Sequence, residues 1–207
     1  MKYIDLTHTF SSVMPVYPGD PQTELHQSAT IDVDGFTDHT LHTSMHVGTH
    51  IDAPLHMISG GKSLSEFEVK KFFGRGVLVD ARGLHEISKE TIVGARIQKG
   101  DIVLFMTGHS AHFGTEAYFA NYPYITEDCA EYLVDTEVLI IGMDTPSPDA
   151  QPFATHKILL KNDVLIVENL TNLSLLTAEE SFQIVALPMK LEADAGPIRV
   201  VAVVPGA

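Results

Sequence analysis

Imidazoles and carboxylates, the groups that bind metal ions and move protons, are concentrated in one stretch of this sequence. The chain has 11 histidines, and six of them fall within 31 positions: His26, His39, His42, His46, His50 and His56. Histidine is the commonest metal ligand, and it titrates near neutral pH. Asp52 lies between the last two of these histidines. A cluster of this density indicates a metal site or an acid–base centre.

Residues 39–52 alternate in polarity, which is typical of a β-strand with one face on a core and the other lining something wet. One alternating set is apolar or β-branched after its first residue, and the other set is polar. His46, His50 and Asp52 share the polar face, with Gly48 between the two imidazoles. Gly48, the β-branched neighbours and Pro54 argue against a helix that would present the two histidines one turn apart.

A fully extended strand would hold His46 and His50 about 13 Å apart at Cα, which is far for one shared ion. We therefore expect a bend at Gly48, or more than one ion, and a bend is favoured. Two imidazoles, Asp52 and His56 within eleven residues favour a metal site over satisfied core or surface histidines. His39 and His42 carry no such expectation.

Further candidate ligands lie where buried strands are expected to end. Glu168 follows the apolar run 164–167, and Asp144 follows the run 138–143. The carboxyl ends of strands are where α/β sheets place their chemistry. His156 stands at the expected start of a short helix. Each has an ordinary alternative: a solvated charge for Glu168, a helix-start residue for His156, and a turn or cap residue for Asp144.

Short apolar runs alternate with helix-like segments along the chain, which predicts an α/β fold. The expected strands are residues 2–6, 77–81, 102–106, 138–143, 164–167, 182–187 and 199–204. Helix starts are expected at two capping boxes, Ser63–Glu66 and Thr177–Glu180, and at Thr126. Residues 23–49 have a more antiparallel character. We therefore expect a mixed sheet within a single domain, residues 1–207.

Composition excludes several classes of protein. The chain has 27 Asp and Glu against 13 Lys and Arg, a formal net charge of −14, and no local basic cluster. Such a surface repels phosphate backbones and anionic lipid, so we expect no nucleic-acid and no membrane partner. The single cysteine, Cys129, excludes an intrachain disulfide and a cysteine-based zinc finger. The first residues lack the apolar core of a signal peptide, and no apolar stretch is long enough to span a membrane, so we expect a cytoplasmic location.

The segment His46-Val-Gly-Thr-His50-Ile-Asp52-Ala-Pro54-Leu-His56 resembles the H-x-G-T-H-x-D-x-P-x-H signature of the metal-dependent cyclase family, which includes bacterial kynurenine formamidases and isatin hydrolases. The likeness continues in collinear blocks at residues 3–7, 15–20, 107–108, 142–147, 156–160, 168–172, 187–191 and 197–199. A long signature with collinear blocks is specific. The resemblance implies mixed β-sheets with flanking helices, a swivelling β/β/α type of fold, and a homodimer or homotetramer.

The resemblance also implies a role for each matching residue. The implied ligands of two divalent ions, zinc or manganese, are His46, His50, Asp52, His156 and Glu168, with Asp52 bridging. His56 would be the proton donor and acceptor. His109 and His112 follow the Thr107-Gly108 block. We expect them either to line the substrate pocket beside these ligands or to lie on the surface.

For activity, the resemblance implies a hydrolase of an amide bond in a small molecule. An arylformamidase that converts N-formylkynurenine to kynurenine and formate, a step of tryptophan catabolism, is the first expectation. The chain departs from the family pattern at two places. Tyr17, the expected substrate-stacking residue, stands where the family's formamidases carry tryptophan. In residues 192–197, the aspartate is flanked by alanines where the family has glycines. A hydrolase of isatin or another cyclic amide is the alternative. A non-catalytic metal-binding protein is a distant alternative. It would have a coordination sphere closed by protein ligands, whereas catalysis requires an open position for water.

Overall fold

A computed structural model describes residues 1–206, and nine strands make its main sheet. These strands are β1 (Lys2–Asp5), β4 (His50–Asp52), β5 (Phe73–Asp80), β7 (Ile102–Met106), β9 (Ile140–Met143), β10 (Leu165–Glu168), β11 (Gln183–Val185), β12 (Ala195–Pro197) and β13 (Val201–Val204). Their spatial order is β1-β13-β11-β5-β7-β9-β10-β4-β12. The four central strands β5, β7, β9 and β10 are parallel, and the outer ones are antiparallel. The predicted mixed sheet is confirmed.

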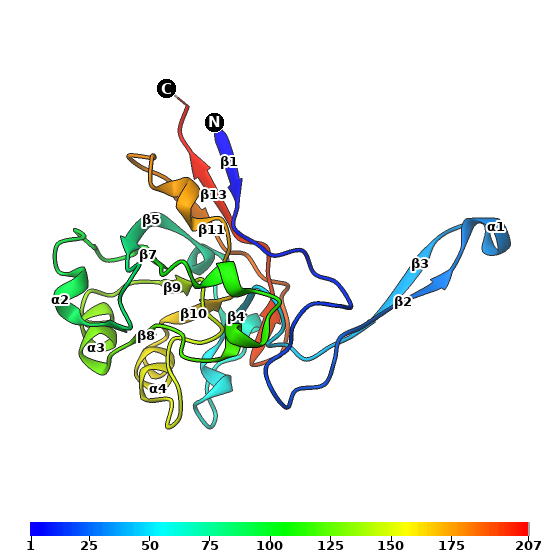
Figure 1. Ribbon diagram of the computed structural model, residues 1–207, viewed down its shortest axis with the longest axis horizontal. Helices are drawn as coiled ribbons and strands as arrows, with labels where there is room; N and C mark the ends of the chain where they lie inside the picture. The colour runs from blue at the N-terminus through cyan, green and yellow to red at the C-terminus, as the bar shows by residue number, and fades with distance from the viewer. Residues whose placement is uncertain (207) are drawn as a thin grey trace.

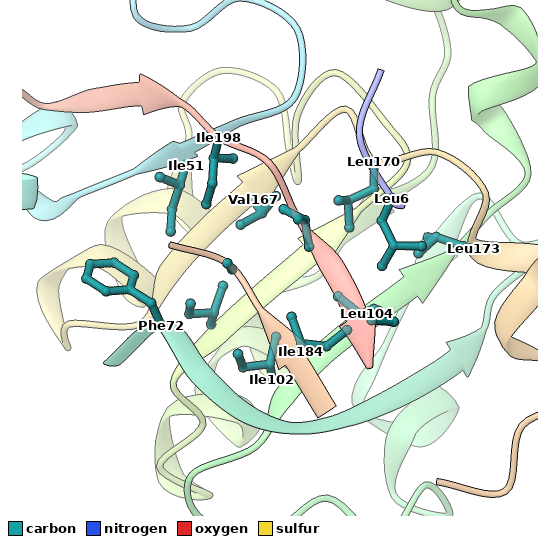
Figure 2. Close-up of a cluster of buried hydrophobic side chains, with 14 of the residues drawn as sticks. Leu6, Ile51, Phe72, Ile102, Leu104, Val167, Leu170, Leu173, Ile184 and Ile198 are labelled. Carbon is teal, nitrogen blue, oxygen red and sulfur yellow. The ribbon is translucent and has the colours of Figure 1, made fainter. Parts of the chain in front are cut away.

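The central strands are apolar on both faces because both faces of the sheet are covered. Along β7, the side chains of Ile102, Leu104 and Met106 enter one core, and Val103 and Phe105 enter the other. Figure 2 shows the first core, where Ile102 and Leu104 lie among side chains from β4, β10 and β11. Both cores share the same four strands, so the sheet joins them.

Helices cover the second face of the sheet (Figure 1). They are α2 (Lys89–Ile92), α3 (Glu127–Asp135) and α4 (Ala154–Lys161), and a short parallel pair, β6 (Glu86–Ile87) with β8 (Tyr124–Ile125), lies beside them. Leu133 of α3 and Leu159 of α4 are buried in this core, as is the free thiol of Cys129. Single 3₁₀ turns connect other elements: η1 (Pro54–His56), η2 (Leu64–Glu66), η3 (Val69–Phe72), η4 (His109–His112), η5 (Glu116–Phe119) and η6 (Leu173–Leu176). No helix within residues 1–206 has the length and apolar character to cross a bilayer.

The prediction of one continuous strand over residues 39–52 is wrong. The chain leaves β3 (Asp38–His42) and forms a strand again only at His50, and Gly48 between them has φ +63°. A Cβ at Gly48 would lie 2.3 Å from the terminal methyl of Met14, so the Met14 side chain would have to move to admit one. The expected bend at Gly48 is confirmed, and the antiparallel character of this region is that of β2 (Glu24–Ala29) paired with β3, with α1 (Ile31–Asp34) between them.

The helix starts have mixed outcomes. The capping box Ser63–Glu66 forms, although it opens only the 3₁₀ turn η2. Thr126 directly precedes α3, as predicted. The predicted helix after Thr177 is wrong: this residue ends η6, and its hydroxyl donates to the Ser174 carbonyl at 2.8 Å. The hydroxyl that was to cap a new helix thus completes the preceding turn.

Candidate metal centre and substrate pocket

The short strand β4 positions the centre of the site. Its middle residue, Ile51, points into the first core (Figure 2), so the flanking His50 and Asp52 project from the other face. β4 lies between β10 and β12, and the antiparallel register sets Glu168 opposite His50. Residues that face each other across antiparallel strands present their side chains on the same face. The pairing of β4 with β10 therefore brings Glu168 to the two β4 ligands.

The structure brings the five predicted ligands, His46, His50, Asp52, His156 and Glu168, into contact. One carboxylate oxygen of Asp52 lies 3.0 Å from His46 Nδ1 and 3.4 Å from His50 Nε2, and its other oxygen lies 4.0 Å from His156 Nε2. The Glu168 carboxylate lies 3.3 Å from His50 Nε2 and, through its second oxygen, 3.3 Å from His156 Nε2. Asp52 thus faces three imidazoles, and Glu168 faces two.

Three of these polar atoms are buried with no hydrogen-bond partner: His50 Nε2 and both carboxylate oxygens of Asp52. Leaving a buried carboxylate unpaired is costly, and a cation removes that cost. Two groups of side chains have ligand atoms within 4.8 Å of one another: His46 with Asp52 and His56, and His50 with Asp52 and Glu168. Imidazole and carboxylate donors suit zinc and manganese. The residues present therefore fit divalent metal ions, with Asp52 common to both groups.

Ion pairing controls the protonation of the metal-free centre. Burial opposes the charged form of His46, but the negative charge of Asp52, 3.0 Å from the ring, raises the pKa of this imidazole to about 9. Burial likewise opposes the charged form of His156, and Asp149 and Glu168 raise its pKa to about 10. Burial alone would raise the pKa of Asp52, but His50 and His46 hold it well below its usual range. Metal binding must therefore displace protons from these imidazoles.

His56 differs from its neighbours. It lies on η1 with its Nδ1 3.5 Å from a carboxylate oxygen of Asp194, and its ring centroid is 4.1 Å from that of His46. Burial, aided by the charges of His46 and His156, lowers the pKa of His56. An imidazole that is neutral at neutral pH can accept a proton from water and return it.

Two further carboxylates that the sequence reasoning missed orient the imidazoles. Asp149 accepts from His156 Nδ1 at 2.5 Å and, through its other oxygen, from the Thr155 backbone N–H at 2.8 Å at the start of α4. Asp194, next to β12, contacts His46 Nε2 at 2.9 Å. A carboxylate on the second ring nitrogen fixes the orientation of a ligating histidine. The sequence offered two signals for these carboxylates. Asp149 lies shortly before His156, and Asp194 lies in the run 192–197.

Asn169 is a third missed residue, and it joins the Gly48 bend to the end of β10. Its side-chain N–H donates to the Gly48 carbonyl at 2.9 Å, and the same carbonyl accepts from His50 Nδ1 at 2.8 Å. The hydroxyl of the fully buried Tyr118 donates to Asn169 Oδ1 at 2.7 Å. Because a carbonyl only accepts, the proton of the neutral His50 ring is held at Nδ1, and Nε2 is free to face Asp52.

Other predicted candidates lie outside the centre. Asp144 accepts hydrogen bonds from the Thr107 N–H and hydroxyl at 2.8 and 2.7 Å and from the Gly108 N–H at 2.8 Å. It is therefore a turn residue, the alternative to a metal ligand that the sequence left open. His39 and His42 lie exposed on β3. His109 bonds the Tyr118 carbonyl at 2.8 Å, and neither it nor His112 lines the pocket above the centre.

A cavity of about 280 Å³ opens above the imidazoles. His56, His156 and Glu168 form part of its lining, and three aromatic side chains, Tyr17, Phe119 and Phe153, line it as well. The rings of Tyr17 and Phe119 meet edge to face with centroids 5.8 Å apart. Tyr17 thus lies where it was predicted, while Phe119 and Phe153 were missed because nothing in their spacing marks them. The pocket can hold a small aromatic molecule next to the ligand cluster.

This chain is similar to known proteins over nearly its whole length. Residues 4–150 match the Cyclase family, described as "Putative cyclase". A kynurenine formamidase of Bacillus cereus is 28% identical, over 97% of this chain and 96% of its own, and one of Erythrobacter litoralis is 32% identical, over 95% and 91%.

Solved structures show the same likeness. A potential metal-dependent hydrolase with cyclase activity has 30% identity and a TM-score of 0.84, covering 100% of this chain and 99% of its own. Isatin hydrolase A from Labrenzia aggregata has 25% identity and a TM-score of 0.87, covering 99% and 94%.

Proposed function

This chain belongs to the cyclase family, and from that premise we propose that it is a metal-dependent hydrolase that cleaves the carbon–nitrogen bond of a small aryl amide. The observation that carries the proposal is the set of unpartnered buried atoms on His50 and Asp52 beneath an aromatic-lined cavity. A structural site is closed by its protein ligands, whereas a catalytic site keeps a position open for water or substrate, and the cavity gives room for one. The names of the relatives, formamidase and isatin hydrolase, support hydrolysis of this kind of bond.

The proposed ligands form two sets that share Asp52. His46 and His50 would hold one divalent ion with it, and His156 and Glu168 would hold a second. When bound, zinc or manganese would supply Lewis-acid polarisation of a carbonyl and acidify water at neutral pH. Asp149 and Asp194 contribute by fixing the second nitrogens of the ligating rings.

His56 is proposed as the group that moves the proton. Its ring lines the cavity and, with its lowered pKa, is neutral when the reaction begins. It accepts a proton from the attacking water and gives it to the nitrogen of the leaving amine. Asp194 contacts His56 Nδ1, so Nε2 is the nitrogen left to exchange the proton. General acid–base catalysis of this kind contributes typically about 10²–10⁴-fold in rate.

N-formylkynurenine is the substrate we propose first, which would place the protein in tryptophan catabolism. Tyr17, Phe119 and Phe153 would supply the aromatic contacts that the tryptophan side chain supplies in the formamidases that this chain resembles. Isatin, a compact cyclic amide, is the second candidate, because a volume of about 280 Å³ is small for a ligand site. We also propose a cytoplasmic location, since the one cysteine of the chain is free and buried.

A comparison of the two substrates tests this proposal. The chain reconstituted with zinc or manganese is given N-formylkynurenine and isatin in separate assays, beside protein treated with a chelator. We expect metal-dependent release of kynurenine with the larger kcat/KM. Metal-dependent opening of isatin alone would reject the formamidase assignment and keep the hydrolase. Hydrolysis of neither substrate by protein that holds its metal would overturn the proposed substrate class.

A further inference from the structure

Tyr118 is the largest fully buried side chain within residues 1–206, and yet it belongs to neither hydrophobic core. It lies on the 3₁₀ turn η5, where the rings of Phe113 and Phe119 meet it edge to face with centroids 5.2 and 5.3 Å away. The ring of His109 stacks on it at 5.2 Å, and His109 Nε2 lies 2.8 Å from its carbonyl oxygen. These contacts fix the position of the Tyr118 ring and therefore of its hydroxyl.

The hydroxyl of Tyr118 has one hydrogen-bond partner, the side-chain oxygen of Asn169 at 2.7 Å. A buried phenol needs such a partner. Burial, aided by the charges of Asp144 and Glu168, raises the pKa of Tyr118 well above its usual value. The phenol therefore keeps the proton that it donates to Asn169.

Asn169 is held on every side. It is only 7% exposed, and its side-chain N–H donates to the Gly48 carbonyl at 2.9 Å. Its backbone N–H donates to the Thr145 carbonyl at 3.0 Å, and its own carbonyl accepts from the Thr49 hydroxyl at 2.6 Å. Its φ of +57° is a left-handed conformation that asparagine tolerates. Each polar group of this residue thus has a partner, and Tyr118 is the partner of the side-chain oxygen.

The amide of Asn169 acts on His50 through the Gly48 carbonyl. That carbonyl also accepts from His50 Nδ1 at 2.8 Å, and Asn169 Nδ2 lies 3.4 Å from the same ring nitrogen. The opposite ring nitrogen, His50 Nε2, faces Asp52 at 3.4 Å and Glu168 at 3.3 Å. A group that holds the second nitrogen of a ligating histidine sets the orientation of the ring. The orientation of His50 therefore depends on the position of the Asn169 amide.

We propose that Tyr118 is a positioning residue of the metal centre: its hydroxyl holds the Asn169 amide in place and, through that amide, the ligating orientation of His50. This inference rests on the metal centre of the proposed function. Tyr118 does not line the cavity, so it does not touch the substrate. Without the hydroxyl, Asn169 Oδ1 is a buried oxygen with no donor, which is costly. We expect the amide to turn toward another donor and to lose its contact with Gly48.

Zinc affinity of the chelator-treated chain tests the proposal. We expect Tyr118→Phe, which removes a single oxygen atom, to weaken zinc binding at least about tenfold. Tyr124→Phe is the matched control, because it removes a tyrosine hydroxyl that bonds the exposed Glu86 at 2.5 Å, and it should bind zinc like the unaltered chain. Undiminished zinc affinity of Tyr118→Phe would overturn the positioning role and leave the proposed function intact. An unaltered chain that binds no zinc would overturn both.

A double-mutant cycle tests whether Tyr118 acts through Asn169. Asn169→Gly removes the amide without straining the backbone, because glycine adopts positive φ freely. If the phenol acts through this amide, Tyr118→Phe should change zinc affinity less than about twofold in the Asn169→Gly background. A tenfold loss in both backgrounds would show that the phenol acts by another route and would overturn the proposal.

Hydrogen exchange at the imidazoles separates positioning from a general loss of stability. In the zinc-bound chain, the Nδ1 proton of His50 bonds the Gly48 carbonyl, and that of His156 bonds Asp149. We expect Tyr118→Phe to speed exchange of the His50 proton at least about tenfold, measured by NMR, and to leave the His156 proton unchanged. Equal acceleration of both protons would mean that Tyr118 only stabilises the fold, which would contradict the proposal.

Discussion

Asp52 is the residue on which the proposed metal centre depends, because both of its buried oxygens lack a hydrogen-bond partner and face three imidazoles. Replacing it with the isosteric Asn keeps the shape and removes the charge. We expect Asp52→Asn to weaken zinc binding by at least about 100-fold, measured by competition with a chromophoric chelator. Asp144→Asn is the matched control: Asp144 is equally buried but bonds only Thr107, Gly108 and Ser110. That variant should lose stability and keep zinc affinity, and equal zinc losses would refute the assignment.

His56 gives a prediction that separates proton transfer from metal ligation. His56→Ala should lower kcat by about 10²–10⁴-fold and leave the metal content unchanged. The measurement pairs steady-state kinetics with metal analysis of the dialysed protein. Because His56 also lies within ligand distance of His46 and Asp52, loss of metal from the variant would make it a ligand instead.

Protonation of the metal-free centre gives a third prediction. A group whose pKa lies above the pH holds its proton, so at pH 7 His46 and His156, with pKa values of about 9 and 10, are charged until a metal binds. We expect zinc binding at pH 7 to release about two protons per chain or more, and affinity to rise with pH toward 9. Calorimetry in buffers of different ionisation enthalpy measures this release. A heat of zinc binding that is the same in every buffer would show that no protons are released and would contradict this prediction.

At the residue scale, the resemblance predicted five ligand positions, which the structure brings together, but it did not predict their supports. The spacing of His46, His50 and Asp52 on one polar face was visible, because alternation is a local property. Asp149 and Asn169 act through contacts that only the paired ends of β10, α4 and the Gly48 bend create. Isolated polar residues in loops carry no periodic signal, so they were missed.

At the level of elements, the bend at Gly48 brings His46 back over β4. Gly48→Ala would meet both a strained φ of +63° and the Met14 methyl 2.3 Å from the new Cβ. We expect it to lower both the melting temperature and zinc affinity. Gly83→Ala is the control, because Gly83 has φ +81° and nothing within 4 Å. That variant should lose only the ~1–2 kcal/mol of the left-handed backbone and retain zinc affinity. Equal effects on zinc binding would show that the bend does not position the ligands.

Seven of the nine strands of the sheet were predicted within a few residues, and the signal was strongest for the central strands, whose apolar, β-branched runs are buried on both faces. The alternation across residues 39–52 misled for a physical reason. A pattern reports that one face is apolar, but it does not report what covers that face. Leu41 fits the pattern and is nevertheless 52% exposed on β3.

At the scale of the whole molecule, the two cores share the strands β5, β7, β9 and β10. Loss of one core would expose the other through the common sheet. We therefore expect the prediction of a single domain over residues 1–207 to hold as one cooperative unfolding transition of the metal-free protein. Calorimetric and van't Hoff enthalpies measured on this protein should agree. Two resolved transitions would show that the cores unfold independently.

The central claim is that the cluster around Asp52 holds the divalent ions on which hydrolysis depends. Its most direct test is a zinc titration of chelator-treated protein in which bound zinc and hydrolysis of N-formylkynurenine are followed together. The account predicts no turnover without metal and full turnover only as a second equivalent per chain binds. Turnover by fully stripped protein, or failure of the protein to bind zinc, would contradict it.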